Sequence, residues 1–320
     1  MKHQKNLPEQ AELEQLAQEY RNFIELETLG VAKSKNSEYP VYGVKLGSKD
    51  PKAPVFALVG GVHGLERIGS HVLISFLKSI LAQTKWDKSW QDLFQHVRLI
   101  AIPILNPTGF ANMRRSNGSG VDLMRNSPLD STGTLIPLVS GHRHGPWLPW
   151  YRGELGAKME DENLYLKSFF ERETFNSDVV ISLDLHSGFG LKDRIWYPWS
   201  TSHLPFPYED KIQKLKELFI EAFPYHIYKI ENQTVNYSNH GDLWDWMYLE
   251  YKKSKPNGIF LPFTLEMGSW MWVKKNPWQF FTVDGLFNPI KKHRYARTMR
   301  RHHNLLEFLL KASTFHEAWT

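Results

Sequence analysis

Apolar segments with two different periodicities alternate along the chain. Continuous apolar runs at 55–59, 97–105, 179–185 and 259–265 predict buried β-strands. Apolar residues spaced three and four apart from Ile68 onwards predict a helix that packs on the core. The same reasoning predicts further helices at 8–30, 163–172, 208–223 and 242–251, and further strands at 41–46 and 225–230. Strands that alternate with helices predict an α/β fold whose mostly parallel or mixed sheet is covered on both faces.

The length of the chain, 320 residues, suits one large α/β domain. We expect this single domain to span residues 1–320. An N-terminal helix is expected within 1–35, and a C-terminal helix at 290–312 is expected to pack on the domain.

Composition excludes some kinds of site and compartment. The chain has no cysteine, which excludes disulfides and thiolate metal ligands and fits a reducing compartment. Residues 1–6 are polar, and no apolar core of a signal peptide follows them. No run of residues approaches the roughly 18 consecutive apolar positions that a membrane-spanning helix needs. We therefore expect a soluble, cytoplasmic protein without a membrane partner.

Charge adds a mild basic excess, with 39 Lys and Arg against 34 Asp and Glu. Much of it lies in 291–303, a run that could contact nucleic acid or an anionic surface. Because apolar residues at helical spacing continue the run, we interpret it as the solvated face of a last helix and expect no nucleic-acid partner. An aromatic cluster precedes it and is interpreted as covering the core or bordering a cleft; its members are Trp270, Trp272, Trp278, Phe280 and Phe281.

Residues of metal-binding types follow three of the predicted strands. His63 and Glu66 follow the first, His186 ends another, and Glu266 ends a third. Because sites in open α/β sheets form beyond the carboxyl ends of strands, these four side chains could converge. Two His and one Glu with an open fourth position form a catalytic zinc set, and a second Glu outside it could act as general base. Alternatively, His63 is an incidental loop residue and Glu66 is the acid of a helix first turn.

A long segment without periodicity, residues 106–155, is rich in Gly, Pro, Asn, Ser and Arg. A loop of this length inside a compact domain is usually functional or disordered. Because it carries Arg114, Arg115, Arg125 and Arg143, we favour a functional loop. Two of these arginines could bind a developing oxyanion and a substrate carboxylate.

Five motifs in a fixed order give the chain a family resemblance. It resembles the zinc carboxypeptidases, the carboxypeptidase A-like metallopeptidases, as an atypical branch. The resemblance extends from the N-terminal helix to about residue 270. Each motif alone is weakly specific, whereas five in the family's order are strong evidence. They are His63-Gly64-Leu65-Glu66, Asn106-Pro107-Thr108-Gly109-Phe110, Arg115-Ser116-Asn117 followed by Gly120-Val121-Asp122-Leu123-Met124-Arg125-Asn126, Asp184-Leu185-His186-Ser187, and Leu265-Glu266-Met267-Gly268.

The resemblance implies a mixed, twisted sheet of about eight strands flanked by helices, with one Zn²⁺ per chain. His63, Glu66 and His186 would hold the ion. Asp122 would accept the spare N–H of His63 and so fix its tautomer. Glu266 would deprotonate the attacking water and then give the proton to the leaving amine.

The resemblance also assigns residues to the substrate. Arg115 would polarise the scissile carbonyl and stabilise the oxyanion, and Arg125 would bind the terminal carboxylate of the substrate. Tyr237 would be the family's mobile tyrosine, since it stands eight residues before Asp245-Trp246-Met247-Tyr248.

The sequence departs from the family pattern at two places, and these departures leave the substrate preference open. Met124 stands where the family has Asn, the partner of Arg125, and a thioether donates no hydrogen bond. Trp244 and Asp242 fall where the family sets side-chain preference. Trp244 would shorten an apolar pocket, while Asp242 would favour a basic or amino-bearing group, and the sequence does not choose between them.

These expectations describe a zinc metallopeptidase that hydrolyses a peptide or peptide-like amide bond by a promoted-water mechanism, as a carboxypeptidase. The alternative is an amidase or deacylase of N-acyl amino acids, similar to aspartoacylase and succinylglutamate desuccinylase. A catalytically silent binding protein is disfavoured, because it would need neither Glu266 nor Arg115. The sequence does not indicate an oligomeric state.

Overall fold

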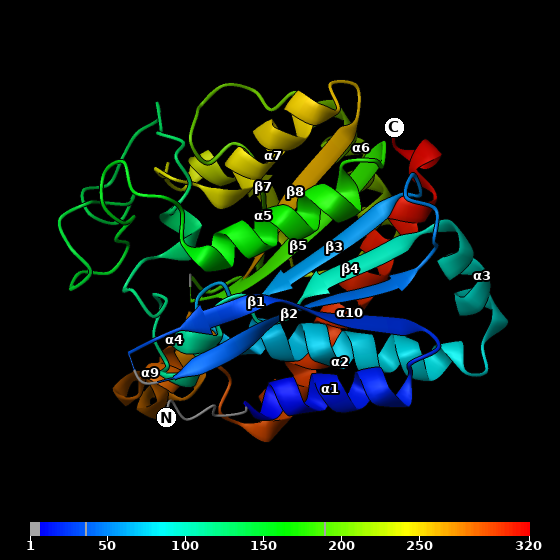
Figure 1. Ribbon diagram of the computed structural model, residues 1–320, viewed down its shortest axis with the longest axis horizontal. Helices are drawn as coiled ribbons and strands as arrows, with labels where there is room; N and C mark the ends of the chain where they lie inside the picture. Colours follow the sequence, from blue (N-terminus) through cyan, green and yellow to red (C-terminus); the bar gives the residue numbers. More distant parts are fainter. Residues whose placement is uncertain (1–6, 36, 189) are drawn as a thin grey trace.

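A mixed sheet of eight strands crosses the centre of the molecule in the computed structural model, which describes residues 7–35, 37–188 and 190–320 (Figure 1). The inner pairs β3–β4, β3–β5 and β5–β8 are parallel, whereas β1–β2, β2–β4 and β6–β8 are antiparallel. The predicted α/β sheet of about eight strands is therefore confirmed. The strands lie in the order β1 (Ile24–Lys33), β2 (Glu38–Gly47), β4 (Arg98–Ile102), β3 (Val55–Gly60), β5 (Val179–Ser187), β8 (Ile259–Met267), β6 (Arg194–Tyr197) and β7 (Lys229–Asn232).

Helices cover both faces of this sheet. On one face α2 and α10 pack on β3 and β5, and α1 and α3 pack beside α2 (Figure 1). On the other face α5 contacts β1 and β2, and α7 contacts β8. The helices are α1 (Pro8–Glu19), α2 (Arg67–Thr84), α3 (Lys88–His96), α4 (Pro107–Ala111), α5 (Asp161–Thr174), α6 (Glu209–Ala222), α7 (Leu243–Ser254), α8 (Trp270–Lys275), α9 (Val283–Phe287) and α10 (Lys292–Thr314).

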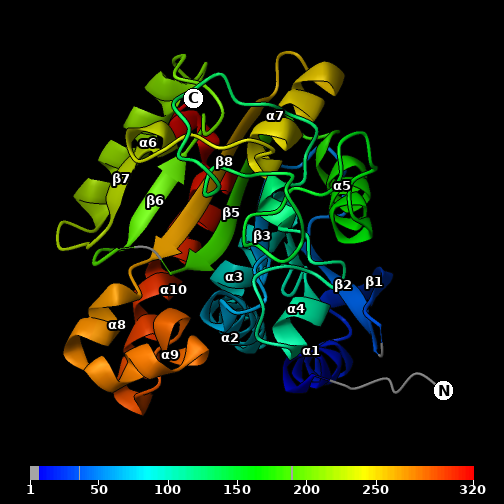
Figure 2. The same ribbon diagram turned by 90° about the vertical axis from the view of Figure 1, so that its left-hand side faces the viewer.

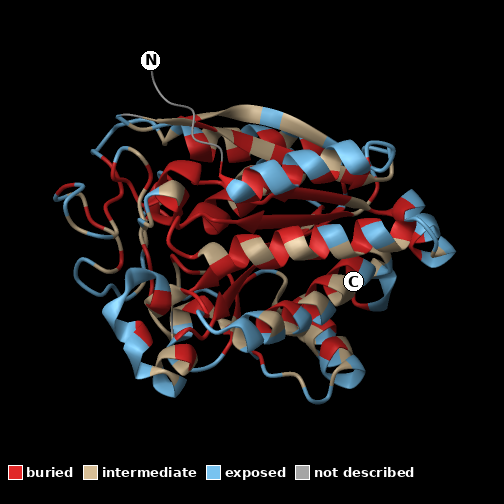
Figure 3. Ribbon diagram, turned by 90° about the horizontal axis from the view of Figure 1, so that it is seen from below, coloured by how far each residue is buried: buried red, intermediate tan, exposed pale blue. Residues whose placement is uncertain are grey.

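The central strands are buried along their whole length. Every residue of β3 and β5 is buried, which explains why both read as continuous apolar runs. Figure 3 shows these strands as the buried interior between helices whose outer faces are exposed. Among the described residues, no helix is both long and apolar enough to cross a membrane.

The N-terminal helix is shorter than predicted. It ends at Glu19, and part of the expected helix forms strand β1, which pairs with β2 from Ile24 to Lys33. Ile24 fits either the helical or the alternating pattern, so pairing with β2 decides its structure. The first residues of the expected segment, 1–6, lie outside the described residues.

Parallel pairing aligns the carboxyl ends of the central strands. Gly60 of β3 pairs with Leu185 of β5, and His186 of β5 pairs with Glu266 of β8. Directly paired residues of neighbouring strands project from the same face of a sheet. The sheet therefore delivers the residues that follow three different strands to one place.

Candidate active site

A tight turn after β3 presents His63 and Glu66. Gly61 has a φ of 62°, a left-handed conformation that glycine adopts without a steric penalty. A side chain at Gly64 would lie 2.0 Å from the carbonyl carbon of Gly109, so the turn packs directly on the start of α4. Glycine is therefore required on both sides of His63, at Gly61 for its backbone conformation and at Gly64 for the close packing.

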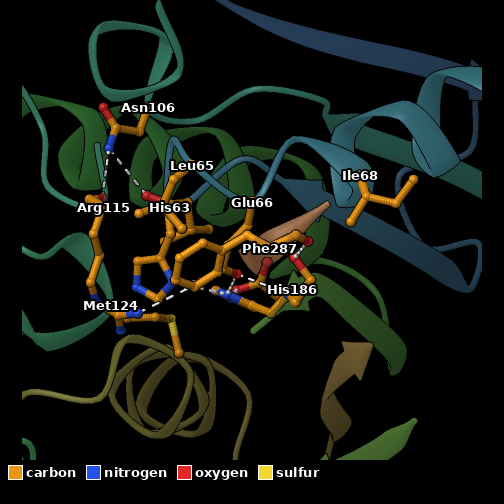
Figure 4. A network of polar contacts seen from close by, with 12 residues as sticks. His63, Leu65, Glu66, Ile68, Asn106, Arg115, Met124, His186 and Phe287 are labelled. Carbon is orange, nitrogen blue, oxygen red and sulfur yellow. Dashed lines mark hydrogen bonds and ion pairs between the residues drawn. The ribbon is translucent and has the colours of Figure 1, made fainter. Parts of the chain in front are cut away.

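Three buried side chains meet beyond the strand ends. His63, Glu66 and His186 point toward one another from the β3–α2 turn and from β5 (Figure 4). The Nδ1 atoms of the two histidines are 3.2 Å apart, and each lies 2.9 Å from an oxygen of Glu66. The structure thus brings together the three residues that the sequence proposes as metal ligands.

Two carboxylates fix the orientation of the imidazole rings. Nε2 of His63 is 3.0 Å from Oδ1 of Asp122, and Nε2 of His186 is 2.8 Å from Oδ2 of Asp184. When each Nε2 donates to its carboxylate, both Nδ1 atoms are left as acceptors. Two such acceptors and the carboxylate of Glu66 face one another, which suits a cation between them.

The spacing of these donors suits zinc. Ligand atoms about 2.0–2.1 Å from a tetrahedral zinc lie roughly 3.3 Å apart. The two Nδ1 atoms are 3.2 Å apart and each is 2.9 Å from a different oxygen of Glu66, and imidazole nitrogen and carboxylate oxygen are normal zinc donors. The residues present therefore fit a zinc ion with a fourth position for water or substrate.

Charge is balanced around the ligands. Burial raises the pKa of Glu66, but His63 and His186 more than offset this, so the pKa lies below its ordinary value. Burial likewise raises the pKa of Asp122, while Arg115 and His63 lower it well below the usual range. The Arg115 guanidinium donates from Nε to Oδ2 of Asp122 at 2.8 Å. Asp122 thus links the arginine to the first histidine.

A cavity of about 400 Å³ adjoins the three ligands. Both glutamates expected at the reaction centre, Glu66 and Glu266, line it. Arg115, Arg125 and Tyr237 line it as well, so these three expected site residues share one space. Burial raises the pKa of the Tyr237 phenol, partly offset by Arg125, which donates a hydrogen bond to it.

The sequence model of the family described as zinc carboxypeptidase matches residues 9–276. The chain belongs to the zinc carboxypeptidase family. Members of this family are zinc-dependent metallopeptidases, so the chain is a member of a hydrolase family, and the structure contains a His-Glu-His cluster that could hold a metal ion.

Individual zinc carboxypeptidases are distant in sequence. The chain is 32% identical over 101 residues to carboxypeptidase SOL1 of Arabidopsis thaliana, which covers 31% of this chain and 20% of that protein. It is 25% identical over 210 residues to the carboxypeptidase N catalytic chain of Rattus norvegicus, covering 58% of this chain and 43% of that protein. The chain therefore spans less than half the length of these curated relatives.

Several solved structures share the fold of this chain. Thrombin activatable fibrinolysis inhibitor superimposes with a TM-score of 0.69 at 18% identity, over 96% of this chain and 72% of that chain. Carboxypeptidase A from Helicoverpa armigera gives a TM-score of 0.67 at 14% identity, over 97% and 73%. These similarities show that the shared fold extends over nearly the whole chain.

The two expected specificity residues lie away from the zinc carboxypeptidase cavity. Neither Asp242 nor Trp244 is among the described residues that line it. Asp242 is the N-cap of α7 and accepts from the backbone N–H groups of Trp244 and Asp245. The indole Nε1 of Trp244 donates to Oδ2 of Asp184 at 2.7 Å. Trp244 thus supports the carboxylate behind His186, and the expectation that these two residues form the pocket needs correction.

Several cavity residues were not singled out from the sequence. They come from the long loop, from β6 and β8, and from the segment after β7; they are Ile136, Val139, Pro149, Trp150, Trp196, Gln233 and Thr264. Their side chains carry no charge, so no motif marked them. Asp184 did carry a signal, because it stands two residues before His186 in a strand and therefore shares its face.

Asn117 holds the loop between Arg115 and Asp122. Its side-chain oxygen accepts from the backbone N–H groups of Ser119 and Val121, and its Nδ2 donates to Glu160 at 2.7 Å and Glu162 at 3.1 Å. Burial raises the pKa of Glu162 to about 7. The loop that carries Arg115 and Asp122 is therefore held, through Asn117, by the carboxyl group of Glu162, which titrates near neutral pH.

Replacing Glu162 by Gln should flatten the dependence of stability on pH. Between about pH 4.5 and 7 the native Glu162 keeps a proton that the unfolded chain releases, so its stabilising effect is lost as pH rises through 7. The loss corresponds to at most about 3 kcal/mol. Urea unfolding at pH 5 and pH 8 should show a smaller difference for Glu162→Gln than for wild type. The matched control Glu217→Gln, exposed on α6, should behave as wild type; identical pH dependence in all three proteins would contradict the assignment.

Proposed function

We propose that this protein is a zinc-dependent carboxypeptidase that hydrolyses the C-terminal peptide bond of a peptide. The observation that carries the proposal is one cavity lined by a two-histidine, one-glutamate donor set, a further glutamate and two arginines. The family match supports the reaction class. It gives no support to the alternative of an N-acyl amino acid amidase.

We propose one zinc ion per chain, held by His63, Glu66 and His186. Zinc, when bound, acts as a Lewis acid that makes water nucleophilic and polarises the scissile carbonyl. Glu266 takes the proton from the attacking water and delivers it to the leaving amine. Arg115, next to Glu66 with Nη1 3.7 Å from its carboxylate, stabilises the oxyanion.

Arg125 is the proposed anchor for the C-terminal carboxylate. It is buried, it lines the cavity, and its Nε has no hydrogen-bond partner among the described residues. A buried guanidinium with spare donors binds a carboxylate strongly and with fixed geometry. Met124 also lines the cavity and offers no donor, so Arg125 acts without the amide that accompanies it elsewhere in the family.

The cavity walls favour an uncharged C-terminal side chain. Ile136, Val139 and Trp196 supply apolar surface, and Thr264 adds an uncharged polar group. Among the described lining residues the carboxylates are Glu66 and Glu266, both assigned to the reaction centre. A C-terminal Lys or Arg would therefore bury its charge without an ion-pair partner, which is costly.

Peptide pairs that differ only in a free or amidated C-terminus test this proposal. We expect release of single residues from the free C-terminus, faster for Leu than for Lys, and a rate at least about 10–100-fold lower for the amide, the range expected when a charge-assisted contact is lost. Arg125→Ala should lose most of this preference, while Glu217→Gln should retain it. Equal cleavage of both peptides would contradict the proposal, and faster hydrolysis of N-acetyl amino acids would favour the amidase.

A further inference from the structure

The aromatic cluster that was expected to cover the core or to border a cleft has two parts: Trp272 is buried in the core, whereas the aromatic residues near position 280 are exposed. Trp278, Phe280 and Phe281 are 79%, 64% and 76% exposed, and Val283 and Ile290 are about half exposed. They belong to residues 270–292, called here the aromatic lobe, which comprises α8, the 3-10 turn Pro277–Phe281, α9 and the residues that lead into α10. Large apolar side chains gathered in this way indicate an interaction surface.

The exposure is built into the fold of the lobe. Gln279, within the same turn, is buried and donates from Nε2 to the carbonyl oxygens of Gly285 at 3.0 Å and Asn288 at 3.1 Å. With Gln279 directed inward, its neighbours Trp278 and Phe280 are left exposed at the surface. The turn therefore holds the aromatic rings outward instead of burying them.

The lobe and the start of α10 contain the whole positive excess of the chain. Residues 270–301 carry eight Lys and Arg against one Asp, which leaves 31 Lys and Arg against 33 Asp and Glu in the remainder. Lys274 and Lys275 precede the aromatic turn, and Lys291 and Lys292 follow it. All four are exposed, and none forms an ion pair with another residue in the described part of the chain. An anionic partner would complement this charge.

The lobe is also attached to the metal-site loops. Asn288 donates to the carbonyl oxygen of Leu65 at 2.8 Å and accepts from the N–H of Ile68 at 2.9 Å, and Phe287 lines the cavity. Figure 2 shows α8 and α9 beyond the carboxyl ends of β5 and β8, where the site lies. Whatever the lobe binds is therefore brought next to the active site.

We propose that the aromatic lobe binds the surface of an anionic lipid bilayer, with Trp278, Phe280 and Phe281 inserted at the interface and the four lysines against acidic headgroups. Exposed Trp and Phe with flanking cations are typical of interfacial membrane binding. Binding of this kind is peripheral and requires no membrane-spanning helix. The proposal is independent of the proposed catalytic activity.

Two other occupants fit the surface less well. A nucleic-acid platform needs rings that offer faces for stacked bases, but the planes of Phe280 and Phe281 are at 88° and those of Trp278 and Phe281 at 42°. A second copy of this chain would bring two strongly cationic surfaces together, which is unfavourable.

Vesicle sedimentation tests the proposal. We expect the wild-type protein to bind vesicles of equal parts phosphatidylcholine and phosphatidylglycerol, to bind phosphatidylcholine vesicles weakly, and to be released from the former by salt. Replacing Trp278 and Phe281 by Ala should abolish most binding. Lys291→Gln and Lys292→Gln should each weaken it about fivefold. Thermal unfolding of the variants should match wild type, because all four side chains are exposed.

Trp86→Ala is the matched control, because Trp86 is 74% exposed and follows the distant end of α2. It should bind vesicles as wild type does. Absence of binding to anionic vesicles, or equal binding by wild type and the Trp278/Phe281 variant, would overturn the proposal. A wild-type dimer that the double variant loses, without vesicle binding, would show self-association and would overturn it as well.

Discussion

Replacing Glu266 by Gln should lower kcat for peptide hydrolysis by about 10²–10⁴-fold, the usual contribution of a general base. Glu266 is the last residue but one of β8 and pairs directly with His186, so the parallel register places both side chains on the same face of the sheet. It lines the cavity but is not part of the three-residue donor set. Gln has nearly the same volume and accepts hydrogen bonds, but it does not take up a proton from water.

Two further measurements on this variant separate a role in proton transfer from a role in metal binding. Zinc content should stay at the wild-type level and KM should change little, because the donor set is intact. Glu217→Gln, an exposed change of the same chemistry, should leave kcat unchanged. Wild-type kcat in Glu266→Gln would exclude Glu266 as the base, and loss of zinc would place it among the ligands.

The position of the metal site could be predicted because it depends on strand order more than on side-chain packing. Apolar runs identify parallel strands, and their carboxyl ends must meet at one edge of the sheet. Polar residues that follow three such runs are therefore expected to be neighbours in space. His63, Glu66 and His186 follow this rule, and the structure brings their donor atoms together.

The walls of the cavity could not be predicted in the same way. Trp244 lies in helix α7, and the position of this helix decides whether the indole enters the cavity or the core. In the structure the indole donates a hydrogen bond to Asp184 and does not line the cavity. Ile136 and Val139 come from a loop without periodicity, so no pattern places them. The residues that form the walls of the cavity are thus set by tertiary packing, which no local sequence pattern predicts.

Two other segments also differ from the predictions because tertiary contacts decide their structure. Residues 24–30 of strand β1 were expected to continue the helix predicted at 8–30, because Ile24 fits helical spacing; pairing with β2 makes them a strand instead. The aromatic cluster was expected to cover the core or to border a cleft; Trp272 is buried in the core, whereas Trp278, Phe280 and Phe281 are exposed. In the turn that contains these exposed residues, the polar side chain of Gln279 is buried and the neighbouring aromatic side chains are exposed. Composition alone does not reveal this arrangement.

Removal of zinc should abolish hydrolysis, the largest effect we expect for any change to this protein. The donor set offers three acceptors that face one another, and both histidines are oriented by carboxylates behind them. Without a cation, neither the water nor the scissile carbonyl is activated. Because the three ligands come from segments of one core, we expect the protein without zinc to remain folded.

The most direct test is a zinc titration of chelator-treated protein, with bound metal and release of a C-terminal residue measured on the same samples. We predict activity below about 1% before titration and a parallel rise of both signals that ends at about one zinc per chain. His186→Ala should bind zinc far more weakly, since one of three ligands is lost. Full activity in protein that retains no metal, or folded protein that binds no zinc, would contradict the account.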